Sequence, residues 1–253
     1  MLRLLAPFFR PAPVLDDDSR RWIQAVFAWA SRQEVLRPRI AGAGLVLPTP
    51  AHFPGQASSR HGMAELVFGN VCRHAGLEGA PFRLANPDDL LDSPVPYAGA
   101  GVPPESVPIP YDPRLVTESE ALIAHFAREL ALRVGATAAE AAPAHEGNIA
   151  HVAELIAVML GFGVMLANTA FHVRVNQCGA CRGPAAERDA ALSRDDLVYA
   201  LALFCRLKGI PPADARRHLQ SPLRPVFRRA LRELDHAPDD WAHIRPQSTG
   251  ATA

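Results

Sequence analysis

Two pairs of candidate metal ligands lie in the second half of the sequence. His125 and Glu129 are four residues apart, and His151 and Glu154 are three apart. On a helix, residues at these spacings lie beside each other on one face. Imidazole and carboxylate are common zinc ligands, and a catalytic zinc site uses three of them and keeps one position open. Because two antiparallel helices can bring both pairs together, the spacing favours a metal site that uses at least three of the four residues.

Each pair also has an interpretation without a metal. The flanking positions on both helix faces are apolar, so the four side chains are expected to be at least partly buried. A histidine and a glutamate in such a place can form a hydrogen-bonded polar network, and nearer the surface they can form an ordinary pair. The sequence leaves these alternatives open.

A second candidate site is the pair Cys178 and Cys181, whose spacing is that of half a zinc ribbon or of a redox pair. His172, six residues before Cys178, would supply a third ligand. The chain has no second CxxC motif, so a loop with incidental thiols stays open as the alternative. The other two cysteines, Cys72 and Cys205, lie on apolar helical faces and are predicted to pack as small hydrophobic residues.

The elements that would position these residues are mainly helices. Hydrophobic periodicity and capping signals predict helices over residues 19–30, 63–74, 117–134, 148–173, 193–208 and 222–234. Short strands are expected over 40–48, 82–84 and 107–111. The predicted fold class is α+β, mainly α-helical: a single domain over residues 1–253 with a zincin-like helix pair. Residues 1–113 would form a small, irregular N-terminal mixed α/β part, 114–237 the helical part with the metal site, and 238–253 a flexible tail.

Composition excludes some classes of protein. The chain has 253 residues, of which 49% are hydrophobic and 21% charged, which is ordinary for a globular protein. The formal net charge is zero, so no global electrostatic attraction to nucleic acid or membrane follows. The apolar run over residues 155–171 approaches membrane-spanning length, but a buried core helix is the preferred interpretation. We therefore expect a cytoplasmic protein without membrane association.

A basic segment extends from Arg206 to Arg232. Such a cluster can bind phosphate groups, but this one has no interleaved aromatic residues and no recognition-helix pattern. Binding of nucleic acid is therefore disfavoured, and a solvated face or contacts with acidic residues elsewhere are expected. The arginines concerned include Arg206, Arg216, Arg217, Arg224, Arg228, Arg229 and Arg232.

Several short motifs together resemble known proteins. The segment from Ile109 into the Leu122–His125 helix resembles the lead into the HExxH helix of zincin-type metallopeptidases. More specifically, the chain resembles an uncharacterised bacterial family with four features. They are an LPTP and FP segment (here Leu47–Pro50 and Phe53–Pro54), a helix similar to LAHELGH (Ile123–His125), a long apolar helix (His151–Gly163), and a YALALF helix (Tyr199–Phe204).

The resemblance implies a zinc site, and the departures from it change the expected chemistry. His125 falls on the first histidine of HExxH, Phe126 on the catalytic glutamate and Glu129 on the second histidine, while His151 and Glu154 fall on downstream acidic positions. A glutamate in place of histidine shifts metal preference towards harder ions, so iron or manganese are alternatives to zinc. Phenylalanine cannot deprotonate a metal-bound water, so ordinary peptidase activity is not expected.

Three hypotheses of function follow from these residues. The first is a zincin-like metal-binding protein with a degenerate hydrolase motif. The second is a metal-free structural or protein-interaction module with a protein or peptide partner. The third is a metal-dependent hydrolase in which Glu129 or Glu154 serves as a relocated general base.

Overall fold

The computed structural model describes residues 13–85, 107–170, 172–174, 185–187 and 190–244. These residues are mainly helical, as predicted, with four three-residue strands in two small pairs. The α-helices are α1 (Asp17–Arg32), α2 (Arg37–Gly42), α3 (Arg60–His74), α4 (Ser119–Gly135), α5 (Ile149–Ala157), α6 (Gly163–Thr169), α7 (Arg194–Lys208), α8 (Pro212–His218), α9 (Leu223–His236) and α10 (Asp239–Ala242). The shorter turns are η1 (Pro113–Thr117), η2 (Glu146–Asn148) and the π-helical η3 (Val158–Phe162), and the strands are β1 (Phe82–Leu84), β2 (Val107–Ile109), β3 (His172–Arg174) and β4 (Ala185–Glu187).

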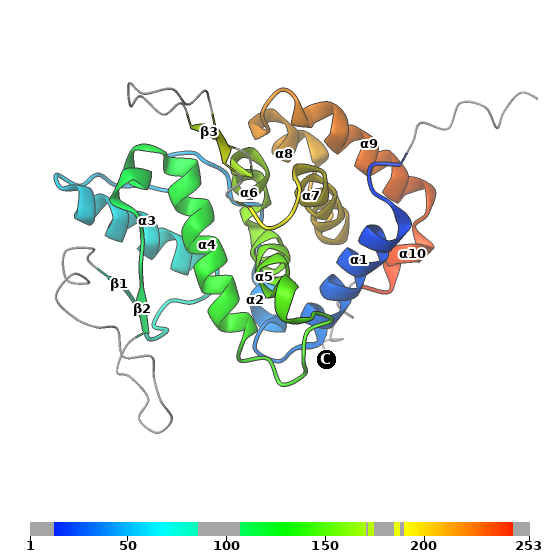
Figure 1. The fold of residues 1–253 in the computed structure, drawn as a ribbon, viewed down its shortest axis with the longest axis horizontal. Helices are drawn as coiled ribbons and strands as arrows, with labels where there is room; N and C mark the ends of the chain where they lie inside the picture. Colours follow the sequence, from blue (N-terminus) through cyan, green and yellow to red (C-terminus); the bar gives the residue numbers. More distant parts are fainter. Residues whose placement is uncertain (1–12, 86–106, 171, 175–184, 188–189, 245–253) are drawn as a thin grey trace, which may run out of the picture.

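A long apolar helix, made of α5, η3 and α6, occupies the centre of the molecule (Figure 1). Its most apolar window has a mean hydropathy of 2.1, and 83% of that window is buried inside the molecule. Helix α4 packs along α5 and α6, α7 packs against α6 and η3, and α1 packs against α5. By length and composition this helix could cross a membrane, yet in the structure it forms the core. The predicted buried core helix is thus confirmed for its described residues.

The central helix is broken at Gly161, which has a φ of +102° inside η3. The break frees the carbonyl of Gly161 to accept a hydrogen bond from the backbone N–H of Val46 at 3.0 Å. A Cβ atom at Gly161 would lie 2.1 Å from the carbonyl oxygen of Gly44. Only glycine combines this positive φ with so close an approach of another backbone. The hydrogen bond from Val46 to Gly161 therefore attaches the segment that follows α2 to the central helix.

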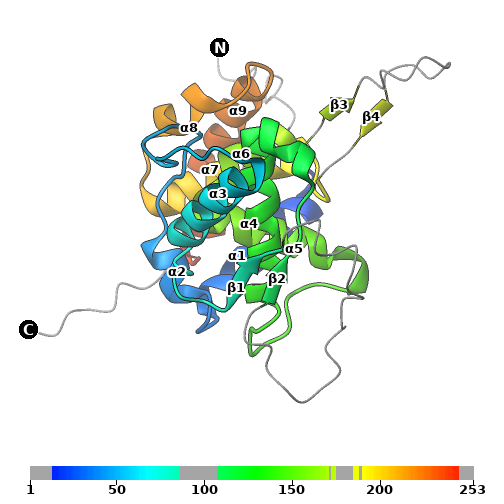
Figure 2. The same cartoon turned by 90° about the vertical axis from the view of Figure 1, so that its left-hand side faces the viewer.

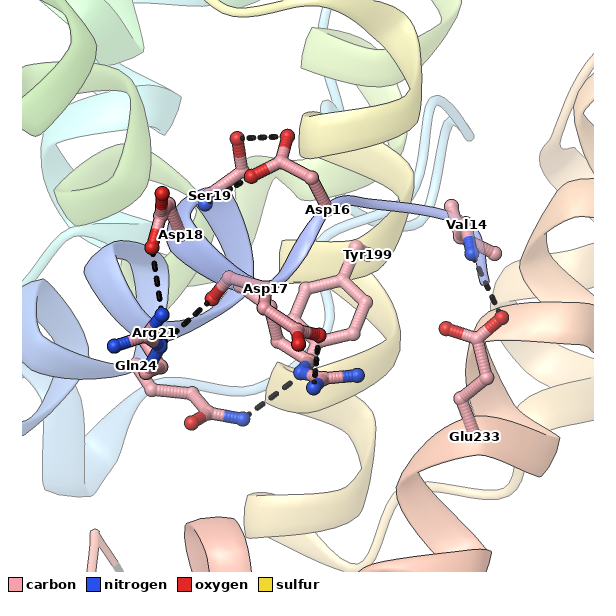
Figure 3. A network of polar contacts seen from close by, with 10 residues as sticks. Val14, Asp16, Asp17, Asp18, Ser19, Arg21, Gln24, Tyr199 and Glu233 are labelled. Carbon is pink, nitrogen blue, oxygen red and sulfur yellow. Dashed lines mark hydrogen bonds and ion pairs between the residues drawn. The ribbon is translucent and has the colours of Figure 1, made fainter. Parts of the chain in front are cut away.

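Helix α1 is attached to the C-terminal helices by polar contacts (Figure 3). Its N-cap Asp16 accepts a hydrogen bond from the backbone N–H of Ser19 at 2.8 Å, which satisfies a free donor of the first turn. The amide of Gln24 donates to the buried hydroxyl of Tyr199 on α7 at 3.0 Å. The backbone N–H of Val14 donates to Glu233 on α9 at 2.8 Å. These contacts place the beginning of the chain against its C-terminal half.

The four strands lie at the periphery. Strands β1 and β2 pair in parallel beside α3, and β3 and β4 pair antiparallel (Figure 2). The short strands predicted at 82–84 and 107–111 are confirmed. The strand predicted over 40–48 is wrong, because Pro38 in the first turn favours helix α2 and the ammonium of Lys208 donates to the carbonyls of Ile40 and Ala41 at 2.9 and 2.7 Å.

Three further sequence-based boundaries change. The helix predicted to begin at residue 117 begins at Ser119, because Thr117 ends the turn η1 and its hydroxyl donates to the carbonyl of Arg114. The helix predicted to reach residue 173 ends at Thr169, and β3 follows it. The first residues of the predicted tail form α10, because Trp241 is buried and donates from its indole nitrogen to the carbonyl of Leu234 at 3.0 Å.

Replacing Gly161 with alanine should destabilise the protein by at least about 2 kcal/mol, because the new Cβ combines a strained positive φ with a backbone clash. The matched control is Gly69→Ala in the exposed middle of α3, where no atom lies within 4 Å of the new Cβ. Alanine there should stabilise by about 0.5–1 kcal/mol. Urea denaturation followed by circular dichroism measures both, and equal effects would contradict the proposed role of the break.

Candidate functional site

His125, the first residue of the predicted metal site, is engaged with the backbone. It lies half-buried on α4, and its Nε2 donates to the carbonyl of Pro110 at 2.8 Å. Its ring also rests against Phe126, with 5.6 Å between ring centroids. Phe126, which stands at the position of the catalytic glutamate in the resemblance, is fully buried and is therefore a core residue. This histidine joins α4 to the segment that follows β2.

Glu129 and Glu154 make different ion pairs. Glu129 pairs with Arg133 one turn further along α4, at 2.6 Å, and both side chains are about one-quarter exposed. Glu154 on α5 is 2% exposed and pairs with the Nε of Arg128 at 2.8 Å. It also accepts hydrogen bonds from the backbone N–H groups of Ala191 at 3.1 Å and Leu192 at 2.8 Å. The Glu154 carboxylate thus joins α4, α5 and the residues that lead into α7.

His151 lies in the first turn of α5, three residues before Glu154. Its ring meets Trp22 of α1 edge-on, with 6.4 Å between ring centroids, and its buried Nδ1 has no hydrogen-bond partner. A small polar cavity of about 220 Å³ borders it between the N-terminal ends of α1, α5 and α7. This cavity is lined by Ser19, Trp22, Ile23, Asn148, His151, Leu192 and Asp196.

The structure does not bring the four predicted ligands together. Within the residues that the structure describes, no three histidine, cysteine, aspartate or glutamate side chains are grouped so that they could hold a metal ion. Cys178 and Cys181 of the second candidate site lie outside the described residues. His172 is the first residue of β3, opposite Glu187 of β4. The arrangement that sequence reasoning missed is the Arg128–Glu154 pair, although Arg128 stands between His125 and Glu129 in the sequence.

Burial explains most of the shifted pKa values. It raises the pKa of the Cys72 thiol to about 11 and that of Cys205 to about 12, so both thiols stay protonated near neutral pH. Cys205 is buried and Cys72 half-buried, which confirms the prediction that they pack as small hydrophobic residues. Burial also raises the pKa of Tyr199 to about 12 and lowers the pKa of Lys208.

An apolar cleft that the sequence did not reveal opens between the C-terminal end of α4 and the N-terminal end of α5. It has a volume of about 390 Å³. Leu132 and Ile149, which are 37% and 50% exposed, are the exposed large hydrophobic side chains of the described chain, and both line this cleft. The other lining residues are Trp29, Ala131, Gly135, Ala136, Ala138, Glu140, Ala141, Ala142, Ala144, His145, Val152, Ala153 and Ile156. The signal in the sequence was the alanine-rich stretch over residues 131–144.

The loop that borders the cleft is fixed to α1. The indole N–H of Trp22 donates to the carbonyl of Pro143 at 2.7 Å, and that of Trp29 donates to the carbonyl of Glu140 at 3.1 Å. The amide of Gln33 donates to the Glu140 carboxylate at 3.1 Å and accepts from the Glu140 backbone N–H at 3.2 Å. These four hydrogen bonds hold the loop in place, so the cleft is formed before any ligand arrives.

A histidine pair joins the segment after α2 to α3. The rings of His52 and His74 are 5.5 Å apart, and the Nε2 of His74 donates to the carbonyl of His52 at 2.8 Å. The pKa of His52 is lowered, first by burial and then by the positive charges that His74 and His218 carry when protonated. The pair therefore resists protonation of His52 in the folded protein.

Comparison with models of protein families, with curated proteins and with solved structures gave no match for this chain. The interpretation of the site therefore rests on its own geometry.

Replacing Glu154 with glutamine should destabilise the protein by roughly 3 kcal/mol, because it leaves the Arg128 guanidinium without its buried carboxylate partner. Glutamine also presents an amide donor to backbone N–H donors. The matched control, Glu129→Gln, breaks a pair whose side chains are about one-quarter exposed, within one helix, and should cost about 0.5 kcal/mol or less. Thermal and urea denaturation measure the difference. Equal, small effects of the two changes would contradict the structural role of Glu154.

Stability should fall as the pH drops below about 6.5, the ordinary pKa of histidine. Because the folded-state pKa of His52 is lower than that of the unfolded chain, the unfolded state binds more protons in this window. The melting temperature of the variant His52→Gln should therefore fall by less than that of the wild type when the pH is lowered from 7 to 5.5. The control is His243→Gln, at an exposed position after α10. A wild-type profile unchanged by His52→Gln would show that this histidine does not cause the acid sensitivity.

Proposed function

We propose that this chain is a metal-independent protein-interaction module, which binds an apolar segment of a protein partner in the cleft between α4 and α5. The observation that carries the proposal is the position of Leu132 and Ile149. A soluble domain usually scatters its exposed large hydrophobic residues, but here those of the described chain line one cavity. Side chains that lose water on binding would recover the free energy that their exposure costs.

The size and shape of the cleft support this proposal. Its volume of about 390 Å³ lies within the range of roughly 300–1,000 Å³ that binding cavities span. The alanines of its walls have short side chains, which let a partner approach the backbone of α4 and α5 closely. Because the loop over residues 136–145 is already hydrogen-bonded to α1, binding does not require it to become ordered.

The polar groups of the cleft favour a protein segment over a small polar metabolite. The Glu140 carboxylate is hydrogen-bonded to Gln33, and His145 lies exposed at the rim. A site for a metabolite usually has several polar groups that converge on the ligand and fix its orientation. A peptide needs only places for its apolar side chains in such a groove.

The contacts of the predicted ligands are the reason to prefer this function to a metal site. His125 donates to a backbone carbonyl, Glu129 pairs with Arg133, and Glu154 accepts from three donors. A zinc site would need at least three of the four groups to turn towards one point. The same contacts weigh against a relocated general base, since both glutamates already hold a cationic partner.

Selection from a random peptide library displayed on phage tests the proposal. We expect the immobilised protein to enrich peptides with two or more apolar anchor residues. The double variant Leu132→Glu/Ile149→Glu should bind a selected peptide at least ten-fold more weakly, which corresponds to about 1.4 kcal/mol. Fluorescence anisotropy with the labelled peptide measures the affinity. The matched control, Ser58→Glu/Ala213→Glu, adds the same charge at exposed positions outside the cleft and should bind as the wild type does.

Two results would contradict the proposed function. One is a selected peptide that binds both double variants equally well, because its site would then lie elsewhere. The other is near-stoichiometric metal in the purified wild type that is lost in His125→Ala, as measured by elemental mass spectrometry. Metal that is retained in His125→Ala and lost in Cys178→Ser would instead assign a metal to the cysteine pair and leave the proposal for the cleft standing.

A further inference from the structure

A row of exposed arginines follows one face of α9. Arg224, Arg228 and Arg232 are four residues apart and all three are exposed, so they lie along one side of the helix with a rise of about 6 Å between neighbours. We call these three residues the arginine stripe. The opposite side of α9 carries Leu223, Ala230 and Leu234, which are buried in the core. The stripe thus faces solvent because the apolar side of α9 faces the protein.

The charge of the stripe is not balanced within the protein. Segment 206–232 holds eight arginine or lysine residues and one acidic residue, Asp214, although the whole chain has a net charge of zero. Asp214 pairs with Arg217, and Asp235, just beyond the segment, pairs with Arg206. Among the described residues, the stripe has no carboxylate at ion-pair distance.

The contacts that the stripe does make leave its charge uncompensated. Arg224 donates to the backbone carbonyls of Leu219 at 2.8 Å and Arg217 at 3.3 Å, and Arg232 donates to the carbonyl of Arg228 at 3.4 Å. A carbonyl oxygen is neutral, and each guanidinium has five N–H donors, so several remain available to an anion. The sequence-based expectation of contacts with acidic residues elsewhere therefore holds for Arg206, which pairs with Asp235, and for Arg229, which lies 4.0 Å from Glu233, but not for the stripe.

We propose that the arginine stripe binds the phosphate backbone of a duplex nucleic acid, without reading its sequence. Consecutive phosphates of one strand rise by about 3.4 Å along the duplex axis and also turn around it, so neighbouring phosphates lie roughly 6–7 Å apart, which matches arginines about 6 Å apart. Arginine suits this contact because its planar group can donate two hydrogen bonds to one phosphate. The lack of interleaved aromatic residues excludes stacking on the bases of a single strand but does not affect contacts to the backbone.

An anionic membrane is the competing partner for such a surface. Helices that bind membranes combine basic residues with an apolar face that enters the lipid. In α9 that face is used in the core, where Phe227 and Leu234 are buried. Without an apolar anchor, each arginine would contribute only about 1 kcal/mol at an anionic surface. The observations therefore favour the duplex.

The test is the salt dependence of binding to a fluorescein-labelled 20-base-pair DNA duplex, measured by anisotropy. Loss of three phosphate contacts should reduce the slope of log K against log salt by about 2.7. The wild type should therefore lose about forty-fold more affinity than Arg224→Gln/Arg228→Gln/Arg232→Gln between 50 and 200 mM salt. The matched control, Arg37→Gln/Arg60→Gln/Arg114→Gln, removes the same charge from exposed positions on α2, α3 and η1, and should keep the wild-type slope.

Thermal denaturation shows whether both triple variants are folded. We expect both to be folded, because the substituted positions are exposed. Equal slopes for the two triple variants, or no binding by the wild type at 50 mM salt, would overturn the proposal. Sedimentation with vesicles that contain phosphatidylserine tests the membrane. Binding to vesicles that depends on the stripe, without binding to the duplex, would also overturn it. Binding to the duplex that depends on the stripe, without binding to vesicles, would support the proposal. The function proposed for the cleft is tested separately by the variants of Leu132 and Ile149.

Discussion

The hydrogen bond from the Val46 N–H to the Gly161 carbonyl is the contact on which the architecture depends. A helix as apolar as Ile149–Thr169 can be buried on all sides only if its backbone donors and acceptors are paired. The break at Gly161 frees a carbonyl in the core, and the segment after α2 supplies the donor. The segment between α2 and α3 is thereby attached to the central helix of a core to which the N-terminal helices also contribute. The positive φ belongs to this attachment, since a side chain at Gly161 would exclude the neighbouring backbone.

The polar residues that first suggested chemistry mostly connect elements around this central helix. Glu154 links α5 to α4 through Arg128 and to the beginning of α7 through two backbone N–H groups. His125 links α4 to Pro110. A buried carboxylate needs a cation and further donors to offset the loss of water, and the structure supplies both. Imidazole and carboxylate at helical spacing are equally suited to a metal and to such contacts, because each role asks for a polar group beside an apolar face.

The sequence predicted the helices well, because hydrophobic periodicity and local caps determine most of them. The Asp16 and Ser193 caps and the Gly209 terminator act within one turn, and α1 and α7 lie where these residues indicate. The end of helix α2 could not be predicted, because its last carbonyls accept hydrogen bonds from Lys208, which is distant in the sequence. The contacts of the predicted ligands could not be foreseen for a related reason: spacing shows that two residues share a helix face, but it does not show which residues of neighbouring elements they contact. The cleft depends on the position of the loop after α4. That position is set by hydrogen bonds from Trp22, Trp29 and Gln33, which belong to α1 and its C-cap.

The two proposed binding surfaces lie at opposite ends of the molecule. Figure 1 shows α8 and α9 at its upper edge and the loop between α4 and α5 at its lower edge. Between them stands the central helix, packed against α4 on one side and α7 on the other, with α9 against α7. An apolar segment in the cleft and a phosphate backbone on the arginine stripe would therefore not compete for space. Binding in the cleft would bury apolar area, whereas binding to the arginine stripe would release counterions from the phosphates. Salt should therefore weaken binding to the stripe and leave binding in the cleft nearly unchanged. If both proposals hold, the chain would connect a protein partner to a polyanion.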